Sequence, residues 1–93
     1  MTIREALKEI GERVRRVVEI EKRGELERLP DGLIIILNRK VIASFSESHD
    51  QLIIKNGNGE TRSYGSKSLP ITTKDTVDAA SFILDAAPGA DAS

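Results

Sequence analysis

The sequence predicts one α+β domain of two layers, in which four antiparallel strands form a meander between two helices (α-β-β-β-β-α). Three observations support this prediction: an amphipathic segment at the start, apolar runs separated by turn signals in the middle, and a second amphipathic segment before the end. With 93 residues, the chain has the length of a single domain. We assign residues 1–88 to this domain and residues 89–93 to a frayed C-terminal tail.

The first helix has recognisable ends in the sequence. Thr2 and Glu5 have the spacing of a capping box, and Gly24 is a natural stop. We therefore expect a helix from Ile3 to Arg23. Its apolar stripe recurs every three or four residues and consists of Ile3, Leu7, Ile10, Val14 and Val17. Residues 25–29 are then expected to form another short turn that folds back onto the domain.

Two hairpins are expected in the middle of the chain. The first pairs a strand at residues 33–37 with a strand at residues 40–46. The second pairs residues 51–55 with a weaker, mostly polar strand at residues 60–64. Between these two strands, the Asn-Gly-Asn-Gly sequence at residues 56–59 is the strongest hairpin-turn signal in the chain.

A second helix is expected from Lys74 to Ala87. Thr72 or Thr73 would cap its start, and Pro70 marks the loop before it because proline disfavours helix at the preceding residue. Its apolar stripe consists of Val77, Ala80, Ile83, Leu84 and Ala87. The Pro-Gly pair that follows would end the helix.

The first hairpin is apolar on both of its faces. Residues directly opposite each other in an antiparallel pair share a face, and a two-residue turn pairs odd with even positions. One face then holds Ile34, Ile36, Val41, Ala43 and Phe45, which we assign to the core. The other face holds Leu33, Ile35, Leu37 and Ile42, which we assign to a partner interface.

Two alternatives remain for what buries this second set of residues. The second helix, or residues 26–29, would cover it from within the chain. Alternatively another chain covers it, most simply a second copy in a homodimer. The first of the four strands would lie at the edge of the sheet, and a long apolar edge is normally paired or covered.

The charge distribution suggests an alternative partner. Fourteen basic and fifteen acidic side chains give a net charge of −1, whereas a dedicated nucleic-acid-binding domain is usually basic. A nucleic-acid-binding accessory protein would use the basic residues of the first helix and the hairpin tip, which are Arg13, Arg15, Arg16, Arg39 and Lys40. No aromatic side chains alternate with them to stack bases. Nucleic acid is therefore the second choice of partner, after another protein.

The sequence offers no catalytic, cofactor-binding or metal-binding residues. Cysteine is absent, which excludes a thiolate nucleophile and a Cys-ligated metal. His49 is the only histidine and lies in a polar loop with Ser48 and Asp50, but a hydrolytic triad needs groups that converge from separate segments. A metal at His49 would need further ligands nearby. We therefore expect neither enzymatic activity nor a cofactor.

No apolar run approaches the roughly 20 residues that cross a bilayer, and the charged N-terminus lacks the apolar region of a secretory signal. We expect a cytoplasmic protein without membrane contact. The function that fits these observations is a small, non-catalytic interaction or regulatory module that self-associates through its apolar first hairpin.

Overall fold

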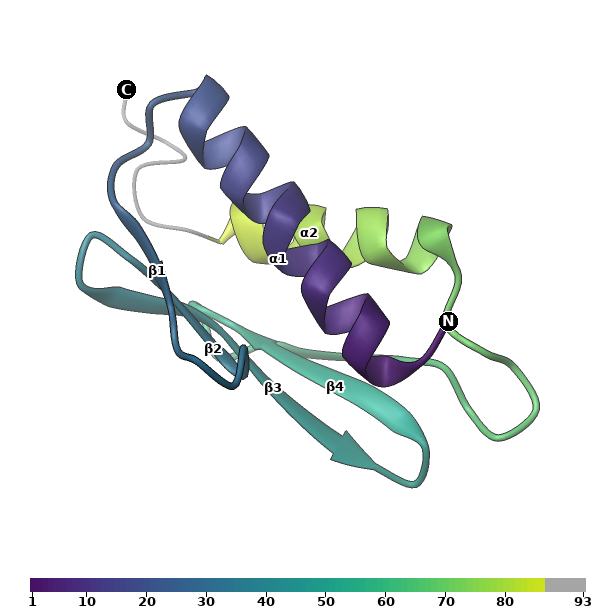
Figure 1. The fold of residues 1–93 in the computed structure, drawn as a ribbon. Coiled ribbons are helices and arrows are strands. Elements are labelled where there is room, and N and C mark those ends of the chain that lie inside the picture. Colours follow the sequence, from purple (N-terminus) through teal and green to yellow (C-terminus); the bar gives the residue numbers. More distant parts are fainter. Residues whose placement is uncertain (87–93) are drawn as a thin grey trace.

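The computed structural model describes residues 1–86, which form a five-stranded antiparallel sheet with both helices on one of its faces (Figure 1). The elements are α1 (Ile3–Ile20), β1 (Leu26–Arg28), β2 (Ile34–Leu37), β3 (Lys40–Ser48), β4 (Gln51–Asn56), β5 (Thr61–Tyr64) and α2 (Thr73–Asp85). The strands lie in the sheet in sequence order. The predicted α+β class, with an antiparallel meander between two helices, is confirmed. The predicted tail at residues 89–93 and the predicted helix end at Ala87 lie outside the described residues.

Both helices begin with a capping box. In α1 the hydroxyl oxygen of Thr2 accepts the backbone N–H of Glu5 at 3.1 Å, and a carboxylate oxygen of Glu5 accepts the N–H of Thr2 at 3.0 Å. In α2 the same reciprocal bonds join Thr72 to Asp75, so Thr72 is the cap. Each pair satisfies two N–H groups that the first turn leaves without helical partners.

Helix α1 ends at Ile20 instead of the predicted Arg23. Lys22 adopts a left-handed conformation with φ of 51°, which turns the chain away from the helix axis. Arg23 then points to the other helix, where its Nη1 donates to the carbonyl of Leu84 at 3.1 Å. This contact satisfies a carbonyl in the last turn of α2 and places a positive charge at the negative end of the helix dipole.

A fifth strand, β1, occupies the segment that we predicted as a turn. It pairs antiparallel with β2, with Leu26 opposite Leu37 and Arg28 opposite Ile35. The apolar strand β2 is therefore an inner strand, so the long hydrophobic edge expected from a four-stranded sheet is covered by the chain itself. Leu26 is half-buried and packs against the core.

A β-bulge in the first hairpin changes which residues share a face. Leu37 lies opposite Lys40 and Ile36 opposite Val41, but Ile35 lies opposite Ala43, so Ile42 is an extra residue in β3. Beyond the bulge, Ala43 and Phe45 share the face of Ile35 and Leu37.

The predicted division of this hairpin into core and interface is corrected. Ile35, Leu37 and Ile42 are fully buried under the helices. Ile34, Ile36 and Val41 do share a face as predicted, but this face carries no helix. Ala43 and Phe45 are buried as predicted.

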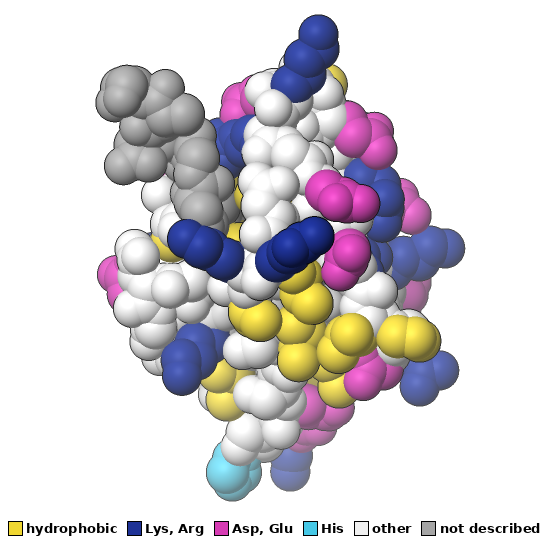
Figure 2. All heavy atoms as spheres, turned by 90° about the vertical axis from the view of Figure 1, so that its left-hand side faces the viewer, with side chains coloured by type: hydrophobic (Ala, Val, Ile, Leu, Met, Phe, Trp, Pro, Cys, Tyr) yellow, Lys and Arg dark blue, Asp and Glu magenta, His cyan; other side chains and the backbone are white. Residues whose placement is uncertain are grey.

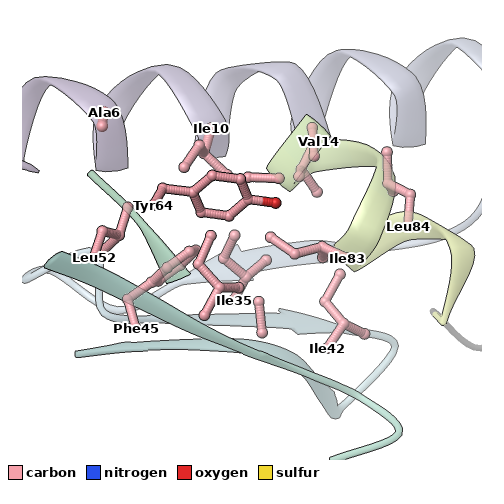
Figure 3. Packing of buried hydrophobic residues seen from close by; sticks show 14 of the residues in the cluster. Ala6, Ile10, Val14, Ile35, Ile42, Phe45, Leu52, Tyr64, Ile83 and Leu84 are labelled. Carbon is pink, nitrogen blue, oxygen red and sulfur yellow. The ribbon is translucent and has the colours of Figure 1, made fainter. Parts of the chain in front are cut away.

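The core lies between the sheet and the two helices (Figure 3). Side chains of α1 and α2 point toward side chains that project from the strands, and each fully buried aliphatic side chain contributes about 1.5–3 kcal/mol to folding. The helices contribute Ala6, Ile10, Val14, Val18, Ala79, Ala80, Ile83 and Leu84. The strands contribute Ile35, Leu37, Ile42, Ala43, Phe45, Leu52, Ile54 and Tyr64, and the loop before α2 contributes Ile71.

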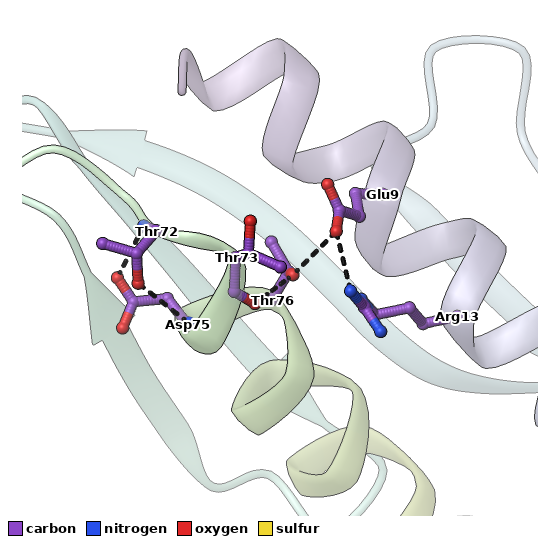
Figure 4. A network of polar contacts seen from close by, with 6 residues as sticks. All are labelled: Glu9, Arg13, Thr72, Thr73, Asp75 and Thr76. Atoms are coloured by element: carbon purple, nitrogen blue, oxygen red, sulfur yellow. Dashed lines mark hydrogen bonds and ion pairs between the residues drawn. The ribbon is translucent and has the colours of Figure 1, made fainter.

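A polar contact also joins the two helices (Figure 4). The fully buried Thr76 of α2 donates its hydroxyl to the carbonyl of Thr73 at 2.6 Å, and this hydroxyl lies 3.4 Å from Oε1 of Glu9 on α1. The same Glu9 oxygen accepts from Nη2 of Arg13 at 2.9 Å. Glu9 therefore pairs with Arg13 of its own helix and lies next to Thr76 of α2, where the two helices meet.

Candidate functional site

The face of the sheet opposite the helices is the main candidate site. Strand register places its outward residues, because directly paired residues share a face. They are Glu27, Ile34, Ile36, Val41, Ser44, Ser46, Ser48, Gln51, Ile53, Lys55, Thr61 and Ser63. Only Glu27 and Lys55 among them are charged. Eight of the twelve are polar, as is normal for the solvated face of an antiparallel sheet, so the four aliphatic residues are the feature that needs an explanation.

Four aliphatic residues of this face form what we call the open-face patch: Ile34, Ile36, Val41 and Ile53. Ile36 and Val41 are direct cross-strand partners, and Ile34 lies two residues before Ile36 on β2. Ile53 on β4 lies opposite Ser46, so the serines of β3 stand between it and the residues of β2. Val41 is 54% exposed, and the other three are half-buried by their neighbours in the sheet.

Hydrophobic side chains gather on one side of the molecule. Figure 2 views the side that carries β1 and the β2–β3 turn, and it shows hydrophobic side chains gathered together with basic and acidic side chains around them. Among the described residues, the exposed aliphatic side chains include Val41 of the open-face patch and Leu29 and Leu33 of the loop between β1 and β2. Apolar side chains gathered at the surface in this way are typical of interaction sites.

Three of the four residues that we assigned to an interface cannot contact a partner in the folded chain. Ile35, Leu37 and Ile42 have no solvent exposure, whereas Leu33 is 39% exposed in the β1–β2 loop. The run of three consecutive isoleucines at positions 34–36 has no polar residue that marks its solvent side. The register of β4 places Ala43 and Phe45 on the helix side, but it does not orient β2, because the bulge at Ile42 brings Ile35 and Leu37 to that side instead of Ile34 and Ile36.

The five basic residues proposed as a nucleic-acid contact do not converge. Arg13 pairs with Glu9 and lines a shallow hollow of α1 together with Arg16. Arg15 lines a different groove of the same helix. Arg39 and Lys40 are exposed at the β2–β3 turn, where Arg39 adopts a left-handed conformation with φ of 68°.

His49 lies at the exposed β3–β4 turn. Its Nδ1 is 2.8 Å from the hydroxyl oxygen of Ser48, and both His49 and Asp50 have positive φ, as a tight two-residue turn requires. Within residues 1–86, no group of three or more His, Cys, Asp or Glu side chains is placed to hold a metal ion.

One cluster of titratable groups joins β5 to α2. The Tyr64 hydroxyl and the Arg62 guanidinium both donate to Oδ2 of Asp78, the latter at 2.9 Å. Burial, assisted by this bond, raises the pKa of Tyr64 to about 12. The hydrogen bond from Tyr64 lowers the pKa of the Asp78 carboxyl. Arg62 also stacks over Phe82, with Cζ 4.4 Å from the ring centre, so the cluster holds two elements together.

Neither helix in the described part of the chain is long and apolar enough to cross a membrane. Comparison of the chain with family models, with curated proteins and with solved structures finds no match.

Proposed function

We propose that this chain is a small, non-catalytic interaction module that acts in the cytoplasm and self-associates through the open-face patch. The observation that carries the proposal is the composition of the helix-free face, which combines Ile34, Ile36, Val41 and Ile53 with only two charged residues. The open-face patch replaces the contact residues expected from the sequence, whereas self-association remains the proposed mode of action.

Face-to-face packing of two such sheets has a low desolvation cost. The remaining neighbours of the patch are mostly serines and threonines, whose burial costs far less than that of charged groups. In a symmetric dimer each patch meets its own copy, so a face rich in one sign of charge would repel itself. Here the two charges have opposite signs and lie on different strands, Glu27 on β1 and Lys55 on β4. A twofold arrangement can therefore place each against the other.

Sheet packing has an established geometry for this purpose. Two sheets pack face to face about 10 Å apart, with their aliphatic side chains interdigitated between them. In such a dimer the sheet of the second copy would cover the face that carries no helix. The divergent positions of Arg13, Arg15 and Arg39 favour this function over nucleic-acid binding, which needs basic residues gathered along one track.

The test is the molar mass of the purified protein in solution. We expect light scattering to give a mass that rises from monomer toward dimer across a micromolar concentration series, and Val41→Lys to give a folded monomer throughout. Val77→Lys is the matched control, because Val77 is a similarly exposed valine on α2 and should leave the dimer intact. A wild-type monomer at high micromolar concentration would contradict the proposal, as would equal dissociation by Val77→Lys.

A further inference from the structure

A second surface lies on the helix side of the molecule, and none of the four residues of the open-face patch lines it. It is a groove of about 780 Å³ between the N-terminal half of α1 and the β1–β2 loop. Its apolar lining comes from both elements and consists of Ile3, Leu7, Leu29, Pro30 and Leu33. Leu29 and Leu33 are 40% and 39% exposed, so the groove presents aliphatic surface to solvent.

One wall of the groove carries a row of positive charges. Arg4, Lys8 and Arg15 are spaced four and seven residues apart along α1, which places them on one side of the helix. Gly11 lies in the gap between Lys8 and Arg15. The guanidinium of Arg28 from β1 fills this gap, since a Cβ on Gly11 would lie only 2.2 Å from its Cζ.

Gly11 thus has a structural reason to be glycine inside a helix, where glycine normally costs about 1 kcal/mol relative to alanine. It lets Arg28 lie across α1 and completes a row of four cations. Arg28 donates Nη2 to the carbonyl of Leu7 at 3.3 Å, and its buried Nε has no hydrogen-bond partner. Its guanidinium is therefore held against α1.

The positive charge of the groove is not neutralised within the described chain. In residues 1–86, none of Arg4, Lys8, Arg15 and Arg28 belongs to an ion pair. The acidic residues of the lining are Asp31 and Glu47, and Asp31 is already engaged by the backbone N–H of Leu33 at 3.0 Å. A chain of net charge −1 therefore has a groove in which cations outnumber carboxylates by four to two.

From this combination we propose that the groove binds an acidic amphipathic segment of a partner protein. Carboxylates of the segment would face the cation row, and its aliphatic side chains would lie on Leu7, Leu29 and Leu33. Nucleic acid fits less well, because the groove has no aromatic side chain on which a base could stack. The cation row is also too open for a small anion, which a compact pocket would have to enclose.

The experiment is a selection from a phage-displayed library of random linear peptides against the immobilised full chain. We expect enriched peptides to combine Asp or Glu with Leu, Ile or Phe. A fluorescein-labelled peptide of the enriched sequence would then be titrated by fluorescence anisotropy against two matched variants, Arg15→Glu and Arg16→Glu. Both are exposed charge reversals at neighbouring positions of α1, but only Arg15 lines the groove.

Arg15→Glu should weaken binding of the peptide roughly tenfold or more, whereas Arg16→Glu should leave it nearly unchanged. Gly11→Ala should also weaken it, because the added methyl group displaces the Arg28 guanidinium. Val41→Lys should bind normally, which separates this site from the self-association proposed above. Circular dichroism would verify that each variant is folded.

Several results would overturn the proposal. These are the absence of enriched peptides, enrichment without acidic residues, and equal binding by wild-type protein and Arg15→Glu. Tighter binding of single-stranded DNA than of the peptide, again lost in Arg15→Glu, would assign the groove to nucleic acid instead. Dissociation of the self-associated protein by Arg15→Glu would mean that a second copy occupies the groove.

Discussion

Tyr64 shows how a single buried side chain makes the stability of this fold depend on pH. The pKa of its phenol is about 12 in the folded chain, against about 10 for an exposed tyrosine. The unfolded chain therefore releases this proton at a lower pH than the folded chain does. The stabilising contribution is complete below about pH 10 and is lost as the pH rises toward 12.

Because Tyr64 is the only tyrosine, its phenolate absorbance reports this directly. We expect the absorbance midpoint near pH 12 in the folded protein and near 10 in concentrated urea. The free energy of unfolding should also fall more steeply above about pH 10 in the wild type than in Tyr64→Phe. A folded-state midpoint equal to that in urea would show that the phenol is not held as the structure indicates.

Residue-scale features were predictable where they depend on near neighbours in the sequence. The cap at Thr2 followed from Glu5 three positions later, because the two hydrogen bonds of a capping box need only that spacing. The bulge at Ile42 was not predictable in this way. It depends on how β3 fits both β2 and the helices, and no glycine or other local signal marks it.

At the scale of elements, the short strand β1 depends on side-chain contacts from the hairpin that it joins. Asn38 in the β2–β3 turn accepts the N–H of Glu25 at 2.9 Å and donates to the carbonyl of Arg23 at 3.0 Å. These bonds fix the connection between α1 and β1 against the hairpin. Gly24 leaves room for them, because a Cβ there would lie 2.1 Å from the Asn38 oxygen.

Asn38→Gly should therefore loosen β1 without disturbing the turn, since glycine readily keeps the left-handed φ of 51° at this position. Loss of two hydrogen bonds is expected to lower the free energy of unfolding by about 1–2 kcal/mol. Hydrogen exchange should accelerate most in residues 25–28. Asn58→Gly, an asparagine replacement in the β4–β5 turn that removes no side-chain bond of this kind, is the control. Equal effects of both variants would contradict this role for Asn38.

The two helices and four of the strands were predictable because their periodicity or turn signals extend over several residues. β1 was not, because a segment of three residues, Leu26–Arg28, is too short to show alternation. Its strand conformation comes from pairing with β2, a contact between segments that the sequence pattern does not connect.

At the scale of the whole molecule, the sequence pattern does not tell which face of the sheet packs against the helices. The first hairpin is apolar on both faces, so its pattern is compatible with either answer. The structure buries Ile35, Leu37 and Ile42 and leaves the open-face patch outside. The surplus of apolar residues in the hairpin is thus divided between the core and the surface that we propose for self-association.

This division predicts how thermal stability depends on protein concentration. A partner that binds only the folded state raises the melting temperature by mass action, so a self-associating chain melts at higher temperature when it is more concentrated. We expect this for the wild type in scanning calorimetry over a micromolar series. Val41→Lys should melt at a temperature independent of concentration, because its dimer does not form.

At the lowest concentration the two proteins should melt at similar temperatures. Val41 is 54% exposed in the single chain, and surface replacements away from buried contacts usually change stability by no more than about 0.5 kcal/mol. A difference that appears only as concentration rises therefore reports association rather than damage to the monomer. Val77→Lys should retain the concentration dependence of the wild type. If the wild-type melting temperature is constant over the series, the open face is solvated in the native state and its aliphatic residues do not mediate self-association.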